Sequence, residues 1–274
     1  MAGIDIMLGA SWIISLIAIV ILCFLPLRHK PVLAAATVMA NAVMTSLVAI
    51  PSLAGTATEL SVYAGSFLGS IQIRIDSLSA WFILIINFTS FTGIWFGSGY
   101  LKGNDSGPEK MSFHWILYIL FHLSMIWVCI LQHGFAFLTA WEIMSLSSML
   151  LVIFDHHNAK TIQAGINYLV QMHISVVFLT IGFIWVYFKT GSFGFDAIGT
   201  FFNSNSNIWL FILFFIGFGI KAGFIPFHSW LPHAHPAAPS HISGVMSGVI
   251  VKLGIYGILR ISSFLSSDQL LLGE

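Results

Sequence analysis

The chain has 274 residues, of which 58% are hydrophobic and only 7% are charged. Soluble domains carry about 25% charged residues, so this chain has too little polar surface to face water and is predicted to be a polytopic membrane protein. Its ten basic and ten acidic residues give a net charge of zero with neutral histidines, which leaves no basic field for binding nucleic acid.

Apolar segments long enough to cross a bilayer, about 20 residues each, recur along the whole chain. They predict an all-α membrane protein with about eight transmembrane helices. The predicted spans cover residues 6–27, 32–54, 77–97, 112–131, 134–154, 162–188, 207–227 and 241–262. Positive charges follow the first span rather than precede it, which predicts a retained first helix with its N-terminus outside.

Two segments between the spans have patterns of their own. In "SIQIRIDS" (70–77) isoleucines alternate with polar residues, which predicts a short strand at the membrane surface. The segment "GSFGFDAIGTFFNSNSN" (191–207) predicts a brief interfacial helix followed by a turn. Basic residues in the loops divide five against three between the two sides, which again favours an outside N-terminus. They are Arg28, Lys30, Lys102, Lys110 and Lys160 on one side and Arg74, Lys189 and Arg260 on the other.

Three charged residues lie inside predicted spans: Glu142, Lys221 and Lys252. Each costs about 2.5–3.5 kcal/mol at a helix centre, so these groups are expected to pair, hydrate or lose their charge. Desolvation favours the neutral form of such a group and pairing favours the charged form, so a group balanced between the two can exchange protons. A static ion pair that holds two helices in register is the alternative. The third charge and the neighbouring histidines favour proton or ion conduction.

The segment "KAGFIPFHSWLPHAHPAAPSHIS" (221–243) holds four of the eight prolines and four of the eleven histidines. Pro226 removes a backbone donor, which predicts a break or kink of the seventh helix near Phe224–Phe227. Within a membrane such a break is tolerated only inside protein or beside a wet cavity, and transporters use broken helices at ion sites. Lys221 lies just before the break, where open carbonyls can stabilise its ammonium group.

The four histidines of this segment are His228, His233, His235 and His241. Their spacings, with no Cys, Asp or Glu between them, do not favour a metal site, although imidazoles suit zinc, copper or iron. Histidine titrates near neutral pH, so a proton relay fits them better. His228 and His241 adjoin the spans and are the stronger candidates. For His233 and His235, exposure to water in a loop is an equal alternative.

Three further histidines, His114, His122 and His173, lie in apolar spans. They are interpreted first as satisfied core residues, with a function as the alternative. Of these, His173 is kept as a weaker relay candidate, together with His233 and His235.

Three motifs together resemble the antiporter-like, proton-translocating subunits of respiratory complex I. They are "WE" (141–142), "KAGFIPFHSWLPHAHPAAPS" (221–240) and "SGVIVKLGIYGILR" (247–260). The same family includes the Mrp cation/proton antiporters and membrane-bound hydrogenases. The stretch "AHPAAPSHISGVMSGVIVKLGIYG" (234–257) is most similar to the large membrane subunit of hydrogenase-4 and formate hydrogenlyase complexes.

This resemblance implies roles for the three intramembrane charges. Glu142 matches the family's fifth-helix glutamate, and Lys221 matches the lysine of the broken seventh helix. Lys252 matches an eighth-helix lysine found in part of the family, whereas other members have a histidine about one turn earlier, where this chain has Ser247. The resemblance implies that Glu142 pairs with Lys221 and controls its protonation. Breaking the pair then lets Lys221 pass a proton along waters to Lys252, driven by redox events in partner subunits.

The chain departs from the family in length. Family members have about fourteen helices, and the fourth to eighth are repeated, inverted, as the ninth to thirteenth. Here residues 1–110 are expected to form three N-terminal helices, 111–265 one five-helix repeat, and 266–274 a tail, with the second repeat absent. The chain is therefore expected to be a fragment or to be completed by a separate polypeptide.

The function that follows is a proton-translocating membrane subunit of a redox-driven complex, of the hydrogenase-4/formate hydrogenlyase or NADH-quinone oxidoreductase type. No redox catalysis and no cofactor are expected in this chain. Other membrane subunits and peripheral redox subunits would carry iron–sulfur clusters and NiFe or flavin. The expected location is an energy-transducing membrane, the prokaryotic inner membrane, and the expected ion is the proton, with sodium as the alternative.

Two other functions remain open from the sequence. One is a Mrp-type cation/proton antiporter subunit. The other is a histidine-rich membrane metalloenzyme such as a desaturase, although the H-x-x-x-H and H-x-x-H-H boxes of that class do not occur in the chain.

Overall fold

Most of the described residues form helices. The computed structural model describes residues 2–65, 69–103, 107–204 and 208–265. Within those residues, seven stretches are long and apolar enough to cross a membrane. They lie in α1 (Ala2–Phe24), α2 (Lys30–Leu53), α4 (Ser77–Tyr100), α5 (Pro108–Ile130), α6 (Gly134–Val152), α7 (Ala159–Thr190) and the continuous run Ser240–Ser262. The predicted all-α membrane class is confirmed.

The remaining helices are shorter. The run Ser240–Ser262 consists of α11 (Ser240–Val245), a π-helical turn η3 (Met246–Ile250) and α12 (Val251–Ser262). The others are α8 (Asp196–Ser204), α9 (Ile208–Ala222), α10 (Leu231–Ala237) and the 3-10 turns η1 (Leu27–His29) and η2 (Leu101–Gly103). The interfacial helix predicted within 191–207 is present as α8, while the turn predicted after it, at residues 205–207, lies outside the described residues.

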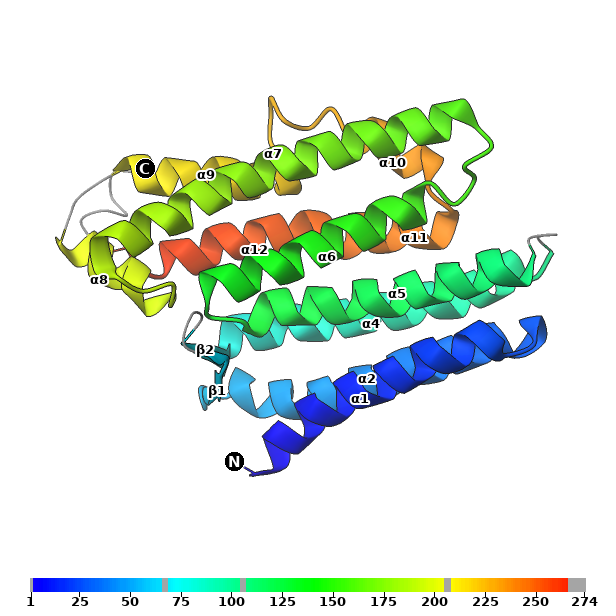
Figure 1. Cartoon of the computed structure of the whole chain (residues 1–274), viewed down its shortest axis with the longest axis horizontal. Helices are drawn as coiled ribbons and strands as arrows, with labels where there is room; N and C mark the ends of the chain where they lie inside the picture. Colours follow the sequence, from blue (N-terminus) through cyan, green and yellow to red (C-terminus); the bar gives the residue numbers. More distant parts are fainter. Residues whose placement is uncertain (1, 66–68, 104–106, 205–207, 266–274) are drawn as a thin grey trace.

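The long helices lie side by side in an elongated bundle (Figure 1). α1 and α2 form one side and pack on α4 and α5, whereas α7 and α9 form the opposite side, with α6 and α12 between. α5 is the most enclosed span and contributes fully buried rings such as Trp115 and Tyr118. Other spans expose large apolar side chains outward, for example Phe88 and Trp95, which is the surface that contact with lipid requires.

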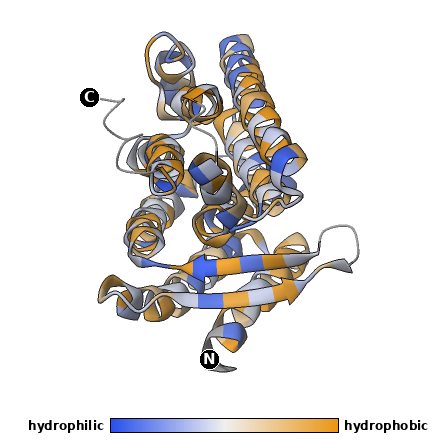
Figure 2. Ribbon diagram, turned by 90° about the vertical axis from the view of Figure 1, so that its left-hand side faces the viewer, coloured by the Kyte–Doolittle hydropathy of each residue, from blue (hydrophilic) through white to orange (hydrophobic). Residues whose placement is uncertain are grey.

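A two-stranded hairpin crosses one end of the bundle (Figure 2). β2 (Ser70–Ile75) is the strand predicted from the alternating isoleucines, and it pairs in antiparallel register with β1 (Thr58–Tyr63), which was not predicted. Ile73 and Ile75 are buried while Gln72 is exposed. The alternation therefore turns one face of β2 toward the bundle and the other toward the surface.

A buried ion pair joins α12 to the start of α4 at the end of the bundle where the hairpin lies. Arg260 of α12 is 4% exposed and donates from Nη1 and Nη2 to the two carboxylate oxygens of Asp76, at 2.5 and 2.8 Å. Asp76 also accepts from the backbone N–H of Ser79 and so caps α4. Arg260 had been counted among the loop charges, but the structure buries it. Burial raises the pKa of the Asp76 carboxyl, but the hydrogen bond and charge of Arg260 outweigh burial and lower it to about 2.

The predicted break of the seventh helix is present. α9 ends at Ala222, earlier than the predicted limit of residue 227, because Gly223 adopts a left-handed conformation with φ of 71°. The indole N–H of Trp230 donates to the carbonyl of Ile220 at 2.9 Å and so satisfies one carbonyl that the helix end leaves open. A Cβ at Gly254 would lie 2.5 Å from the Ala222 nitrogen. α12 therefore lies directly against the end of α9.

Candidate functional site

Lys221 lies in the last turn of α9 and is completely buried. Its ammonium group donates to the hydroxyl oxygens of Ser145 at 3.0 Å and Tyr168 at 3.1 Å. The Tyr168 hydroxyl in turn bonds the Ser148 hydroxyl at 2.8 Å. An ammonium group has three N–H donors, and the described residues supply acceptors for two of them. The side chain is thus held by neutral hydroxyl groups in the middle of the protein.

Two aromatic rings complete the surroundings of Lys221. Its Nζ lies 5.7 Å from the ring centroid of Trp141 and 5.4 Å from that of Tyr168. The faces of aromatic rings attract a cation, and more strongly when water is excluded. These rings and the hydroxyl groups can hold a positive charge without a carboxylate in contact, so the site can keep a proton and can also release one.

Glu142 lies three residues before Ser145 on α6, which places both side chains on the same face of that helix. The resemblance implies that Glu142 pairs with Lys221; in the described residues, the groups that hydrogen-bond the ammonium are the hydroxyls of Ser145 and Tyr168. Oε2 of Glu142 is buried and has no hydrogen-bond partner there. The two groups do interact electrostatically without contact.

The imidazole of His173 (α7) lies near Glu142, with Nε2 at 3.9 Å from Oε2. The other ring nitrogen, Nδ1, lies 3.0 Å from the carbonyl oxygen of Leu169. A histidine that donates from Nδ1 to a carbonyl presents Nε2 to its other neighbour, either as a lone pair or, when protonated, as a donor. His173, a weaker candidate from the sequence, is therefore the relay candidate that the structure places beside Glu142.

Lys252 lies on an exposed face of α12, and its ammonium group donates to the Ser247 carbonyl at 2.8 Å. That carbonyl belongs to the π-helical turn η3, where the usual helical hydrogen-bond pattern is interrupted. In the described residues Lys252 makes no contact with Lys221, although their helices α12 and α9 pack together. A mid-span charge on an outer face costs free energy in lipid, so this face suits a protein or water environment.

The histidines around Pro226 do not gather at one point. His228 is exposed, His233 faces a surface pocket, and Nδ1 of His235 lies 3.0 Å from the Ser243 hydroxyl. His241 is 2% exposed and lies 2.9 Å from His114, measured between the two Nε2 atoms. In the described part of the chain, no three His, Cys, Asp or Glu side chains are close enough together to hold a metal ion.

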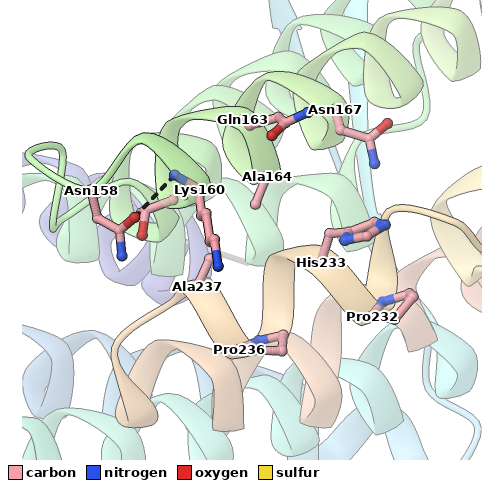
Figure 3. A pocket seen from close by; sticks show the side chains of 10 residues that line it. Asn158, Lys160, Gln163, Ala164, Asn167, Pro232, His233, Pro236 and Ala237 are labelled. Atoms are coloured by element: carbon pink, nitrogen blue, oxygen red, sulfur yellow. Dashed lines mark hydrogen bonds between the residues drawn. The ribbon is translucent and has the colours of Figure 1, made fainter.

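A pocket of about 570 Å³ opens at the end of the bundle where α10 lies, between α10 and the start of α7 (Figure 3). Lys160, Gln163 and Asn167 line it from α7, and His233 lines it from α10. A polar strip leads on from it, because the Gln171 amide donates to the Asn167 side chain at 3.3 Å and to the Ser229 hydroxyl at 2.6 Å. This strip joins α7 residues next to Tyr168 to Ser229, which follows the break of the seventh helix.

Sequence reasoning missed the hydroxyl groups that hold Lys221. Ser145 follows Glu142 by three residues and belongs to the run "SLSS" (145–148) in an apolar span, so its helical spacing could have placed it on the face of Glu142. Tyr168 had no such signal, because a single tyrosine in an apolar helix is common and its partner is far away in the sequence.

The family of NADH:quinone oxidoreductase and Mrp antiporter transmembrane proteins matches residues 132–271. Hydrogenase-4 component B of Escherichia coli (strain K12) is 38% identical over 194 residues, which cover 70% of this chain and 28% of that protein. The chain therefore matches under a third of the length of this curated relative.

Two solved structures share the fold. The membrane-bound sulfane sulfur reductase, an archaeal respiratory membrane complex, has a chain that superposes with a TM-score of 0.81 at 20% identity, over 99% of this chain and 42% of that one. A chain of the Mrp complex from Dietzia sp. DQ12-45-1b superposes with a TM-score of 0.78 at 18% identity, over 96% and 49% respectively.

Proposed function

Because the chain belongs to the NADH:quinone oxidoreductase/Mrp antiporter transmembrane family, we propose that it is a proton-translocating membrane subunit of a redox-driven complex. The observation that carries the proposal is the completely buried amine of Lys221, held by two hydroxyl groups beside a helix break. The similarity to hydrogenase-4 component B favours a complex of the hydrogenase-4/formate hydrogenlyase type over one of the NADH-quinone oxidoreductase type.

The proposed step centres on the charge of Glu142. An ionised Glu142 attracts the Lys221 ammonium from beyond Ser145 and keeps the proton on the amine. When Glu142 is protonated, or when a protonated His173 beside it offsets its charge, that attraction weakens. Burial still disfavours the ammonium form of Lys221. Lys221 then releases its proton. The hydroxyl groups of Ser145 and Tyr168 hold the amine in either state, because a hydroxyl group can accept or donate.

Lys252 is the proposed next acceptor, since its helix packs on α9 and its amine is held by a carbonyl of η3. His228, His233, His235 and His241 are proposed to exchange protons with water along the segment that follows the break of the seventh helix. The residues 1–110 and 111–265 are proposed as the N-terminal helices and the antiporter-like repeat. The proposed tail, 266–274, lies outside the described residues.

The chain is an integral, multi-pass membrane protein. We place it in the prokaryotic inner membrane with its N-terminus outside. Its proposed partners are other membrane subunits and peripheral redox subunits that carry iron–sulfur clusters and NiFe or flavin.

A Mrp-type cation/proton antiporter subunit is the second candidate, favoured by the superposition on the Mrp complex. In the described residues, no three His, Cys, Asp or Glu side chains gather as a metal site would need, so no observation there supports a metalloenzyme.

Glu142→Gln is expected to lower the proton flux of the assembled complex at least about tenfold, because the amide keeps the size of the side chain but cannot carry the charge that acts on Lys221. The flux is measured as uncoupler-sensitive acidification in sealed vesicles and is normalised to the amount of assembled complex. Glu59→Gln, at an exposed position of the hairpin, is the matched control and should leave the flux unchanged. A wild-type flux in Glu142→Gln would refute the role of this carboxylate.

A further inference from the structure

Two histidines from distant parts of the sequence form a buried pair. His114 of α5 and His241 of α11 are each 2% exposed, and their Nε2 atoms lie 2.9 Å apart. A neutral imidazole carries one N–H and one lone pair. At this distance one Nε2 must donate and the other must accept. The two rings therefore share a single proton along the line between them.

The outer nitrogen of each ring has no protein partner. Nδ1 of His114 and Nδ1 of His241 are both buried, and the described residues offer neither a donor nor an acceptor to them. Buried polar atoms are nearly always paired in proteins, and an exception calls for an explanation such as water or a catalytic role. A pair that only joined two helices would need neither Nδ1 atom.

Packing holds both rings in place. The His114 ring lies 5.0 Å from that of Trp115 and 4.9 Å from that of Phe154, measured between centroids. A Cβ at Gly97 would lie 2.6 Å from Cδ2 of His241, so the imidazole fills space that only a glycine leaves. Rings fixed in this way keep the short distance between the Nε2 atoms, which proton transfer between them requires.

Few charged or titratable groups surround the pair. Lys110, four residues before His114 on the same face of α5, supplies the charge that acts on His114 from outside the pair. Tyr118 donates its hydroxyl to the Ser90 carbonyl at 2.7 Å, and Tyr100 of α4 packs on the His241 ring. Among the described residues the neighbours are thus one lysine and two phenols, so the imidazoles are the groups there that can pass a proton.

Two polar lines lead from the pair into the bundle. His241 begins the run that continues through η3 to Lys252, 11 residues or about 16 Å further along the helix. On α5, His114 is followed at intervals of four residues by Tyr118 and His122, and both ring nitrogens of His122 are buried without a partner in the described residues. The pair therefore stands between the end of the bundle that carries Lys110 and two lines of polar groups, of which the one on α5 is buried.

We propose that His114 and His241 form a proton-transfer pair that connects the membrane interface with the relay of this chain; this rests on the proposed function. A proton binds Nδ1 of one imidazole, the shared proton moves across to the Nε2 of the other, and that second imidazole releases its own Nδ1 proton. One proton enters and one leaves, and the two tautomers are exchanged. Before a second proton can follow in the same direction, each imidazole must return to its first tautomer, with its N–H proton moving from one of its own ring nitrogens to the other.

Glutamine separates a relay from a structural bond, because its amide lies near the position of Nε2 and still hydrogen-bonds but does not pass protons as an imidazole does. His114→Gln, His241→Gln and the double variant are measured in the assembled complex, by proton flux in sealed vesicles and by thermal unfolding. His156→Gln, an exposed histidine after α6, is the control. We expect about tenfold lower flux in each single variant, no further loss in the double variant, and unfolding as in the wild type.

The pH profile gives a second readout that a structural role would not change. The wild-type flux is expected to depend on pH in part through the titration of these two imidazoles, and the double variant should lose that part of the dependence. A double variant whose flux is within twofold of the wild type would overturn the proposed proton-transfer pair. A double variant that loses flux and also unfolds at a clearly lower temperature would show that the pair is structural, which would overturn the proposal as well. If the wild-type complex itself moves no protons, the proposed function fails, which is a separate result.

Discussion

Replacing Lys221 with methionine is expected to lower proton translocation roughly 100-fold or more, the largest effect of any single change in this chain. Methionine is unbranched and fills a similar space, so the packing against Trp141 and Tyr168 should persist while the group that carries the proton is lost. The measurement is uncoupler-sensitive acidification in sealed vesicles that contain the assembled complex, with the amount of complex determined in parallel.

The matched control is Lys189→Met, which removes an exposed lysine from the last turn of α7 and should leave the flux unchanged. In Lys221→Met, Ser145 keeps its hydrogen bond to the Trp141 carbonyl and Tyr168 keeps its bond to Ser148. Assembly is therefore expected to survive. Wild-type flux in a fully assembled Lys221→Met complex would show that the buried amine is structural.

Asp76→Ala is expected to destabilise the chain by about 3–5 kcal/mol, because it leaves the buried guanidinium of Arg260 without its carboxylate. The same change removes the cap of α4, which contributes about 1 kcal/mol. The measurement is the free energy of unfolding in detergent, by denaturant titration. Asp196→Ala, at an exposed aspartate that begins α8, is the control and should change stability little.

The double variant Asp76→Ala, Arg260→Met should recover much of the free energy of unfolding that Asp76→Ala loses, because it removes the unpaired guanidinium together with the carboxylate. The pH dependence has a defined direction. The pKa of Asp76 falls from 3.8 to about 2 on folding, so its contribution is complete above about pH 4 and is lost as the pH falls toward 2. A single Asp76→Ala variant with wild-type stability would show that Arg260 is satisfied without the carboxylate.

The transmembrane helices could be predicted because lipid demands apolar side chains and backbone hydrogen bonds within each span. The break could be predicted from Pro226 for the same reason. The partner of the predicted strand could not be predicted, because "TELSVY" (58–63) buries none of its side chains and forms a strand by pairing with β2. Arg260 was misplaced because its ion partner, Asp76, is 184 residues away in the sequence.

The candidate site was predicted in part. Lys221 and Glu142 stand out in the sequence because a charge inside a membrane span is costly. Their contacts could not be derived, since helix rotation decides whether a carboxylate or a hydroxyl reaches the amine. Ser145 and Tyr168 take that place, and Glu142 faces His173 instead. The His114–His241 pair needed the structure, because it joins residues 127 positions apart that the sequence offered only as separate histidines.

The most direct test of the proposed function is to isolate this chain with its partner subunits from native membranes, reconstitute the complex in sealed vesicles, and follow internal pH during turnover. The proposal predicts uncoupler-sensitive proton movement driven by electron transfer and equally fast with and without sodium. Electron transfer without proton movement, or proton movement that requires sodium, would contradict it, and the second result would favour the cation/proton antiporter instead.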